Sequence, residues 1–226
     1  ACRLAENGPL FLERVRRETG LSLEIVSRET EARLAVAGCA TLIDSRSEGA
    51  LLFDIGGGSS ELVWLDLRQR GEARGFALTR FIKAWTSLPV GVVTLSERHG
   101  GHVVTREVYE GMVDEVGGLL ASFDGMEGAA ELVASGRAHM LGTSGTVTTL
   151  AGIHLGLKRY DRRRVDGVWL DGVQVDDMIG TLLDMGYDQR VANPCIGADR
   201  ADLVLAGCAI LDAIRRASSA LNVRMF

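Results

Sequence analysis

The sequence lacks the cysteine spacing of a disulfide framework or a metal site. Its four cysteines are scattered singly, with no C-x-x-C pair, and each stands among small apolar residues. Isolated thiols of this kind are typical of reduced core residues in a cytoplasmic protein. We therefore expect Cys2, Cys39, Cys195 and Cys208 to be buried free thiols and the protein to be cytoplasmic.

Long apolar runs and a net positive charge are also missing. The longest runs, such as Ala50–Phe53 and Leu203–Gly207, fall well short of the roughly 18 residues that a membrane-spanning helix needs. The net charge is -5 at pH 7, so no global field attracts nucleic acid. We expect neither a membrane segment nor dedicated binding of nucleic acid.

Two common catalytic patterns are absent as well. The four histidines show no H-x-x-x-H spacing, which leaves a zinc site without support. No G-x-S-x-G segment is present, and Gly142–Gly145 does not match the spacing of that nucleophile elbow.

The composition and length indicate a globular protein of one large or two small domains. Hydrophobic residues make up 46% of the chain and charged residues 24%, which excludes a disordered or fibrous protein. The sequence has 28 glycines, and its only lysines are Lys83 and Lys158, against 23 arginines. It begins with Ala1 in the lead-in to an expected helix, so we expect a fragment.

Apolar periodicity and glycine breaks predict an α/β protein with a meander of three strands near residue 60. We expect helices over Pro9–Glu18, from the cap Ser27 to Cys39, over Thr105–Phe123, from the loop Gly142–Thr146 to Leu155, and over Val173–Met185 and Asp199–Ala217. We expect strands over Leu21–Val26, Ala50–Ile55, Glu61–Leu67, Ala73–Thr79 and Ala138–Leu141.

A first candidate site follows the strand Ala50–Ile55. Asp54 stands near its end, and the segment Gly56, Gly57, Gly58, Ser59 comes next. Backbone amides freed of side chains can bind phosphate oxygens, and the neighbouring carboxylate can hold Mg²⁺. The alternative is an ordinary glycine-rich turn.

A second glycine-rich loop leads from a strand into a helix and consists of Gly142, Thr143, Ser144, Gly145 and Thr146. Aligned amides and the helix dipole favour an anion at such a helix N-terminus. Ser144 could equally be a simple helix cap. The two loops together favour a phosphate-binding cleft over two unrelated turns.

Two further features carry weaker signals. Glu31 lies on the expected helix one turn before Leu34, at the edge of an apolar stripe, but with Glu29 it could merely complement the helix N-terminus. The run Lys158–Arg164 contains Arg162, Arg163 and Arg164, which could contact a polyanion. A solvated loop is the alternative for this run.

At these residues the chain resembles the exopolyphosphatase and guanosine pentaphosphate phosphohydrolase family, within the actin, sugar-kinase and heat-shock ATPase superfamily. The matching segments are Ser27–Leu34, Phe53–Val63, Leu141–Thr146 and Ala198–Asp202. Their order and spacing agree over nearly the whole chain. The resemblance implies a two-lobed, actin-like (ribonuclease H-like) α/β fold.

The resemblance also implies roles for individual residues. Glu31 matches the catalytic glutamate that activates water, which reverses the interpretation drawn from its spacing alone. Asp54 and Glu61 match acidic positions tied to Mg²⁺. The loops Gly56–Ser59 and Gly142–Thr146 match the phosphate loops of the family.

The chain departs from the family in several places. Arg28 and Thr30 stand where the family has glycine and often a second acid. The N-terminal D-x-G-S-N-S loop and the closing D-R-G-L-R-E-G segment are absent. We therefore expect a chain truncated at both ends, with the end of a first actin-like domain over 1–48 and a second domain, lacking its last strand, over 49–226.

The implied reaction is the Mg²⁺-dependent hydrolysis of the terminal phosphoanhydride of inorganic polyphosphate, with Glu31 as general base. Guanosine pentaphosphate is the alternative substrate. A phosphotransferase of the same fold and a nucleotide-sensing module without turnover are alternatives from other classes. A homodimer is left open as the assembly.

Overall fold

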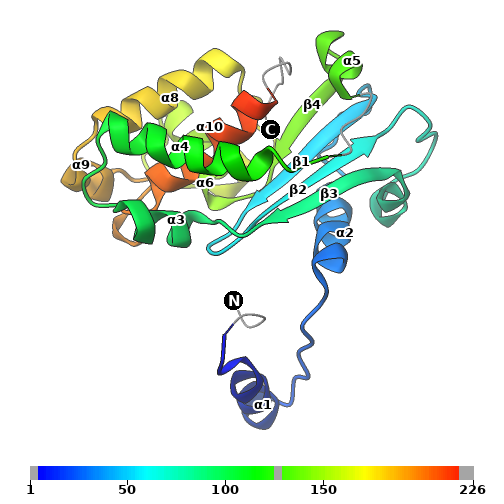
Figure 1. Ribbon diagram of the computed structural model, residues 1–226, viewed down its shortest axis with the longest axis horizontal. Coiled ribbons are helices and arrows are strands. Elements are labelled where there is room, and N and C mark those ends of the chain that lie inside the picture. The colour runs from blue at the N-terminus through cyan, green and yellow to red at the C-terminus, as the bar shows by residue number, and fades with distance from the viewer. Residues whose placement is uncertain (1–4, 125–128, 219–226) are drawn as a thin grey trace.

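A mixed four-stranded sheet with helices on both faces forms the body of the protein (Figure 1). The computed structural model describes residues 5–124 and 129–218. The strands are β1 (Gly49–Ile55), β2 (Ser60–Asp66), β3 (Ile82–Leu88) and β4 (Ala138–Gly142). Their order is β3-β2-β1-β4, with β1 antiparallel to β2, β2 antiparallel to β3 and β1 parallel to β4. The predicted α/β class is confirmed.

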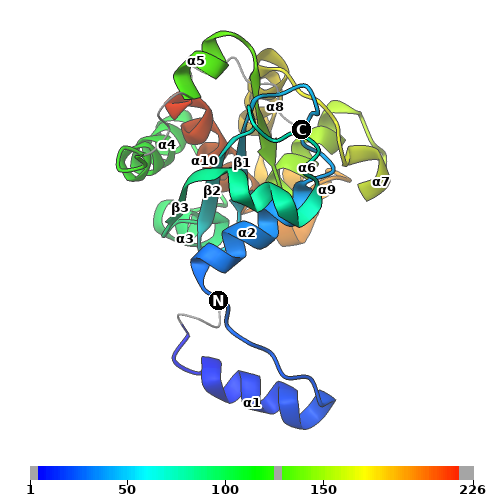
Figure 2. The ribbon, with the colours of Figure 1, turned by 90° about the vertical axis from the view of Figure 1, so that its right-hand side faces the viewer.

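The helices lie on both sides of this sheet, with α2 on one face and α4 and α10 on the other (Figures 1 and 2). The described helices are α1 (Gly8–Thr19), α2 (Arg28–Cys39), α3 (Val92–His99), α4 (Arg106–Leu120), α5 (Ala129–Ala134), α6 (Gly145–His154), α7 (Arg162–Val165), α8 (Gly172–Asp184), α9 (Tyr187–Ala192) and α10 (Val204–Ala217). Short 3₁₀ helices span Gly75–Phe81 and Ala198–Arg200.

Strand β1 is apolar along its length because both of its faces are buried. Leu51 and Phe53 pack in the core beneath α4 and α10, whereas Ala50 and Leu52 pack in the core beneath α2. Successive side chains of a strand point to opposite faces, so each core receives every second residue. A strand buried on both faces therefore reads as a continuous apolar run rather than as an alternation.

Helix α2 begins where the sequence predicts. The Ser27 hydroxyl accepts a hydrogen bond from the Thr30 amide at 3.1 Å, which satisfies one of the free amides at the helix start. Ala32 and Val36 face the sheet and are buried, whereas Leu34 is 53% exposed, so the expected stripe through Leu34 is wrong. The division at residue 48 stays a prediction, and α2 packs on the sheet formed by the later residues.

Two predicted strands are wrong. Residues 21–26 are extended and mostly exposed but do not join the sheet, and α1 stands away from the body at the far end of this segment (Figure 1). In the second case, the chain forms a 3₁₀ helix over Gly75–Phe81 instead of the strand Ala73–Thr79. Gly71 and Gly75 have φ values of 51° and 54°, which break an extended chain. The third strand of the meander is Ile82–Leu88.

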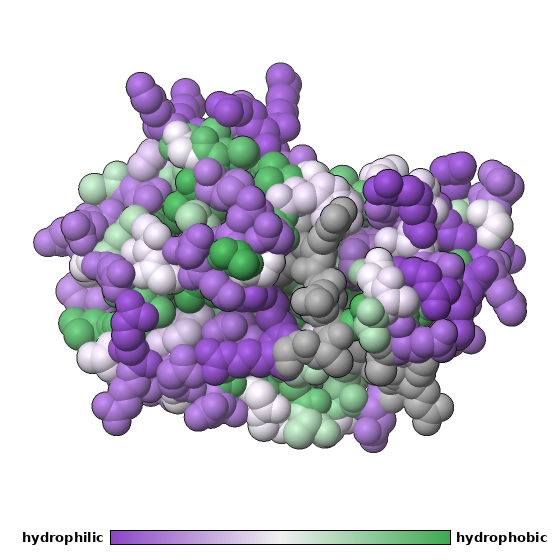
Figure 3. All heavy atoms as spheres, turned by 90° about the horizontal axis from the view of Figure 1, so that it is seen from above, coloured by the Kyte–Doolittle hydropathy of each residue, from purple (hydrophilic) through white to green (hydrophobic). Residues whose placement is uncertain are grey.

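The prediction of buried free thiols is confirmed for two of the three cysteines within the described residues. Cys195 and Cys208 are buried and free, Cys39 is free and half-buried, and Cys2 lies outside the described residues. No helix within the described ranges has both the length and the apolar character to cross a membrane. Polar side chains dominate the face seen from above in Figure 3, with apolar residues in small groups between them.

Helix α10 is the central helix of the larger core and is buried along most of its length. It begins at Val204, after the 3₁₀ turn, rather than at Asp199 as expected. Gly207 lets its backbone approach the start of α6 closely, because a Cβ atom at this position would overlap the side chain of Thr146. The contact thus fixes the N-terminal turn of α6 against the core.

Adding a methyl group at Gly207 should therefore destabilise the protein. We expect Gly207→Ala to lower the free energy of unfolding by about 1–3 kcal/mol, the usual cost of overpacking. Gly180 on α8 is the matched control, since a Cβ there meets nothing within 4 Å. Gly180→Ala should raise stability by about 0.5–1 kcal/mol through helix propensity. Urea denaturation of both variants measures their free energies of unfolding. If Gly207→Ala is as stable as Gly180→Ala, the tight contact is contradicted.

Candidate active site

Two carboxylates face each other at one end of the sheet. Asp54 on β1 is directly opposite Glu61 on β2 in the antiparallel register. Both continue the alternation that places Leu52 and Val63 beneath α2, so their side chains lie on that face. Directly opposed residues have Cβ atoms about 4.5–5.5 Å apart, which is close enough for strong repulsion between like charges.

Glu31 on α2 adds a third negative charge. Burial raises the pKa of Asp54 to about 6, and the charges of Glu61 and Glu31 act in the same direction. A hydrogen bond with Thr143 partly opposes this shift in pKa. The charge of the predicted catalytic residue Glu31 therefore acts on Asp54, one of the two predicted metal positions, and Glu61, the other, acts on it as well.

Ser87 on β3 holds Glu61 in place. Glu61 is only 4% exposed, and the Ser87 hydroxyl donates a hydrogen bond to its Oε1 at 2.9 Å. The two residues are direct partners in the β2–β3 register. Sequence reasoning missed Ser87 because it misplaced the third strand. The alternation within Ile82–Leu88 is the signal that could have found it.

The loop between β1 and β2 is held by the start of α3. The Gly56 amide donates to the Ser59 carbonyl at 2.9 Å, and the carbonyls of Gly56 and Gly57 accept from the first amides of α3. Gly57 and Gly58 are exposed. Within the described residues their amides donate no hydrogen bond, so these two amides are available to an anion.

The second loop is anchored directly beside Asp54. The amide and the hydroxyl of Thr143 both contact the Phe53 carbonyl, at 2.9 and 3.4 Å. Gly142 packs against the Phe53 ring, and an added Cβ there would lie 2.5 Å from a ring carbon. Ser144 caps α6 by accepting from the Val147 amide at 3.4 Å, so the cap reading holds for its hydroxyl. The loop thus brings the N-terminus of α6 to the carboxylates.

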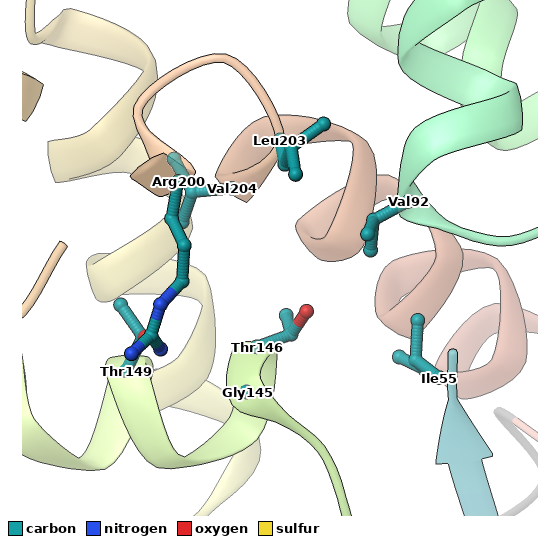
Figure 4. A pocket seen from close by; sticks show the side chains of 8 residues that line it. All are labelled: Ile55, Val92, Gly145, Thr146, Thr149, Arg200, Leu203 and Val204. Carbon is teal, nitrogen blue, oxygen red and sulfur yellow. The ribbon is translucent and has the colours of Figure 1, made fainter. Parts of the chain in front are cut away.

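A small pocket of about 90 Å³ adjoins this helix start (Figure 4). Arg200 reaches across it to Thr149 on α6, and its Nη1 donates to the Thr149 hydroxyl at 3.3 Å. The same guanidinium lies 5.7 Å from the centre of the Tyr160 ring. The pocket is lined by Ile55, Val92, Gly145, Thr146, Thr149, Arg200, Leu203 and Val204. Sequence reasoning assigned no role to Arg200, although it lies in the matching segment Ala198–Asp202.

The predicted polyanion contacts are not part of this pocket. Arg162, Arg163 and Arg164 are exposed on α7, and Arg162 pairs with Asp166 at 3.5 Å. Arg162 and Arg164 line a separate hollow of about 800 Å³ beyond the C-terminal end of α6, together with Lys158 and other residues. Tyr160 lines that hollow too and contacts Arg200, so it connects the two regions.

The donor chemistry of the carboxylate pair fits a hard divalent cation. Within residues 5–124 and 129–218, no group of three His, Cys, Asp or Glu side chains could hold a metal ion by itself. Mg²⁺, however, is usually bound by one or two carboxylates, waters and the phosphates of a substrate. Asp54 and Glu61 offer such a pair. The pKa of Asp54 is raised mainly by burial and then by the charges of Glu61 and Glu31, and a bound cation would offset these charges.

Comparison with known proteins identifies relatives over almost the whole chain. The sequence model for the Ppx/GppA phosphatase family matches residues 1–224. A guanosine-5'-triphosphate,3'-diphosphate pyrophosphatase of Aeromonas salmonicida is 31% identical over 214 residues, which are 94% of this chain and 38% of the relative. The chain thus spans well under half the length of the curated relatives that it matches.

Solved structures give the same result. An exopolyphosphatase-like protein superimposes with a TM-score of 0.77 at 29% identity, covering 97% of this chain and 66% of that one. The PPX-GPPA enzyme of Aquifex aeolicus gives a TM-score of 0.75 at 25% identity, covering all of this chain and 68% of that one. These likenesses confirm the actin-like fold that the resemblance implies.

The raised pKa of Asp54 makes a prediction for stability. Folded Asp54 holds its proton more tightly than the unfolded chain does, so its contribution to stability falls as pH rises from about 4 to about 6. Asp54→Asn removes this loss. We expect its stability relative to wild type to increase by about 1–2 kcal/mol between pH 4 and pH 8, after allowance for solvent screening.

Asp66 on β2 provides the control for this measurement. Its pKa is lowered by hydrogen bonds with Arg68, so it is ionised in both the folded and the unfolded chain above about pH 5. The effect of Asp66→Asn should therefore be flat between pH 5 and pH 8. Urea unfolding across this range distinguishes the variants, and a flat profile for Asp54→Asn would contradict the raised pKa of Asp54.

Proposed function

The chain belongs to the Ppx/GppA phosphatase family, and from that membership we propose that it hydrolyses the terminal phosphoanhydride bond of inorganic polyphosphate. The observation that carries the proposal is the convergence of Glu31, Asp54 and Glu61 with two glycine loops. Carboxylates supply a base and cation ligands, and loop amides supply donors for phosphate oxygens. Phosphoryl transfer, to water or to another acceptor, needs both kinds of group at one place.

The reaction assigns one role to each group. Glu31 accepts a proton from a water molecule as the water oxygen attacks the terminal phosphorus. The bridging P–O bond breaks, orthophosphate leaves, and the shortened chain keeps the bridging oxygen. Phosphoryl transfer of this kind depends mainly on positioning and on stabilising charge, so no covalent enzyme intermediate is required.

The two loops hold the phosphate to be transferred. The exposed amides of Gly57 and Gly58 approach it from the β1–β2 turn, and the first amides of α6, at Gly145 and Thr146, approach from the helix end. Asp54 and Glu61 would hold Mg²⁺, with Ser87 keeping Glu61 in position. When bound, Mg²⁺ neutralises charge on the phosphate oxygens.

The basic hollow beyond α6 supports a polymeric substrate. Lys158, Arg159, Arg162 and Arg164 line it, and Arg163 is exposed next to them. Tyr160 and Arg200 connect this region with the start of α6. A helix of ten residues is about 15 Å long, so a chain of several phosphates is needed to reach from one end of α6 to the other.

Guanosine pentaphosphate is the second candidate substrate. It is favoured by the 31% identity to the Aeromonas salmonicida guanosine-5'-triphosphate,3'-diphosphate pyrophosphatase. Its terminal 5' phosphate presents the same bond to Glu31, so the mechanism is unchanged. The substrates differ in the group to which the terminal phosphate is attached. In polyphosphate it is a run of further phosphates, and in guanosine pentaphosphate it leads to a nucleoside.

The test compares two glutamates on one helix. We expect Glu31→Gln in the complete gene product to keep substrate binding but to lower kcat by about 10²–10⁴, the usual effect of removing a general base. Glu29→Gln is the control, because Glu29 is exposed and pairs with Arg33 at 3.2 Å. Its activity should be close to that of the wild type.

Orthophosphate release from polyphosphate and from guanosine pentaphosphate, without any acceptor, is the measurement. Release that requires an acceptor would favour a phosphotransferase, and binding without release would favour a sensing module. Near-normal turnover of folded Glu31→Gln would contradict the assignment of the base.

A further inference from the structure

A second large hollow lies at the opposite end of the sheet from Asp54. It has a volume of about 580 Å³ and is formed by residues 40–46 after α2, by Arg70 and residues 73–75 after β2, and by Leu78 and Trp169. Residues 40–46 precede the start of β1 at Gly49, and Asp54 lies five residues along that strand. At about 3.3 Å per residue, the hollow is about 15–20 Å from the carboxylates.

Positive charge on one wall of the hollow is not fully neutralised. Arg46 forms hydrogen bonds with both oxygens of Asp44, at 3.2 and 3.0 Å. Arg70 is half-buried, and its Nη1 lies 3.5 Å from the carbonyl oxygen of Asp44. Among the described residues no carboxylate lies within ion-pair distance of Arg70. The nearest acid to Arg74 is Glu72 at 3.7 Å, and both are highly exposed, so this pair is weak.

The other wall is apolar and includes an aromatic ring. Trp169 is 36% exposed, and its ring lies 5.8 Å from the ring of buried His139. Leu42 and Leu78 continue this wall. An indole beside arginines provides a stacking surface for a planar ring together with donors for an anion.

We propose that this hollow, the Arg70–Trp169 hollow, binds a nucleoside phosphate. The phosphate lies between Arg70 and Arg74, and the base stacks on Trp169. The volume falls within the range of about 300–1,000 Å³ that small-molecule sites occupy. The hollow shares no residue with the carboxylates or the glycine loops, so the proposal is independent of the proposed function.

Fluorescence of Trp169 reports on this site alone. The chain has three tryptophans, of which Trp64 is buried, and Trp85→Phe removes the other exposed indole. In this background we expect adenosine 5'-diphosphate to quench the fluorescence with a saturable curve. Inorganic pyrophosphate, which carries the charge without the ring, should bind at least tenfold more weakly. Trp169→Phe should abolish the quenching by adenosine 5'-diphosphate.

Arginine variants identify the anion contact. Arg70→Gln and Arg74→Gln should each weaken the binding of adenosine 5'-diphosphate by roughly tenfold, because each removes a charge-assisted contact. Arg68→Gln is the matched control on the same turn, since Arg68 lies outside the hollow and pairs with Asp66 at 2.6 Å. Arg74 is 78% exposed, so its variant tests the proposal even where Arg70→Gln fails to fold.

Three results would overturn the proposal. The first is the absence of saturable quenching by adenosine 5'-diphosphate. The second is binding of adenosine 5'-diphosphate that is equally tight in Arg68→Gln and Arg74→Gln. The third is pyrophosphate binding as tight as that of the nucleotide, which would remove the ring from the site. None of these outcomes bears on phosphate release at Glu31.

Discussion

The register between β1 and β2 determines where the two carboxylates Asp54 and Glu61 lie. It sets Asp54 opposite Glu61 and places both on the face covered by α2. A slip of one residue in either strand would send the carboxylate of that strand into the apolar core beneath α4 and α10. The buried residues on each face of the two strands prevent such a slip. It would move the side chains of one core into the other and expose neither face to its proper partners. Packing of the core and placement of the carboxylates are thus one constraint.

Close contacts at two glycines fix the second loop, Gly142–Thr146, against β1 and α10. Gly142 lets the loop pass the Phe53 ring, and Gly207 lets α10 approach the first turn of α6. The amides proposed to bind phosphate at the start of α6 therefore rest on the most buried part of the protein. Like charges at Asp54 and Glu61 cost folding energy, and the rigid core around them offsets that cost. Such an arrangement is expected where binding of a cation and phosphate later neutralises the site.

Sequence reasoning located the elements with strong local signals. The Ser27 cap, the apolar run of β1 and the glycine loop before α6 each depend on residues close together in the chain, and all three are confirmed. Contacts between distant segments were missed, as for Ser87 beside Glu61 and Arg200 beside Thr149. The strand expected over Ala73–Thr79 is wrong because Gly71 before it and Gly75 within it adopt left-handed conformations, which composition alone does not reveal. The role proposed for Glu31 came from family resemblance, since its spacing favoured a simple helix-end charge.

The account depends most on a cation joining the two carboxylates to the phosphate. The direct measurement is the Mg²⁺ dependence of phosphate release by the complete gene product and by its Asp54→Asn and Glu61→Gln variants. Each amide keeps the shape of the side chain but loses a charge that holds a hard cation. The account predicts that both variants need roughly tenfold more Mg²⁺ for half-maximal rate. An unchanged Mg²⁺ requirement in both variants would contradict it.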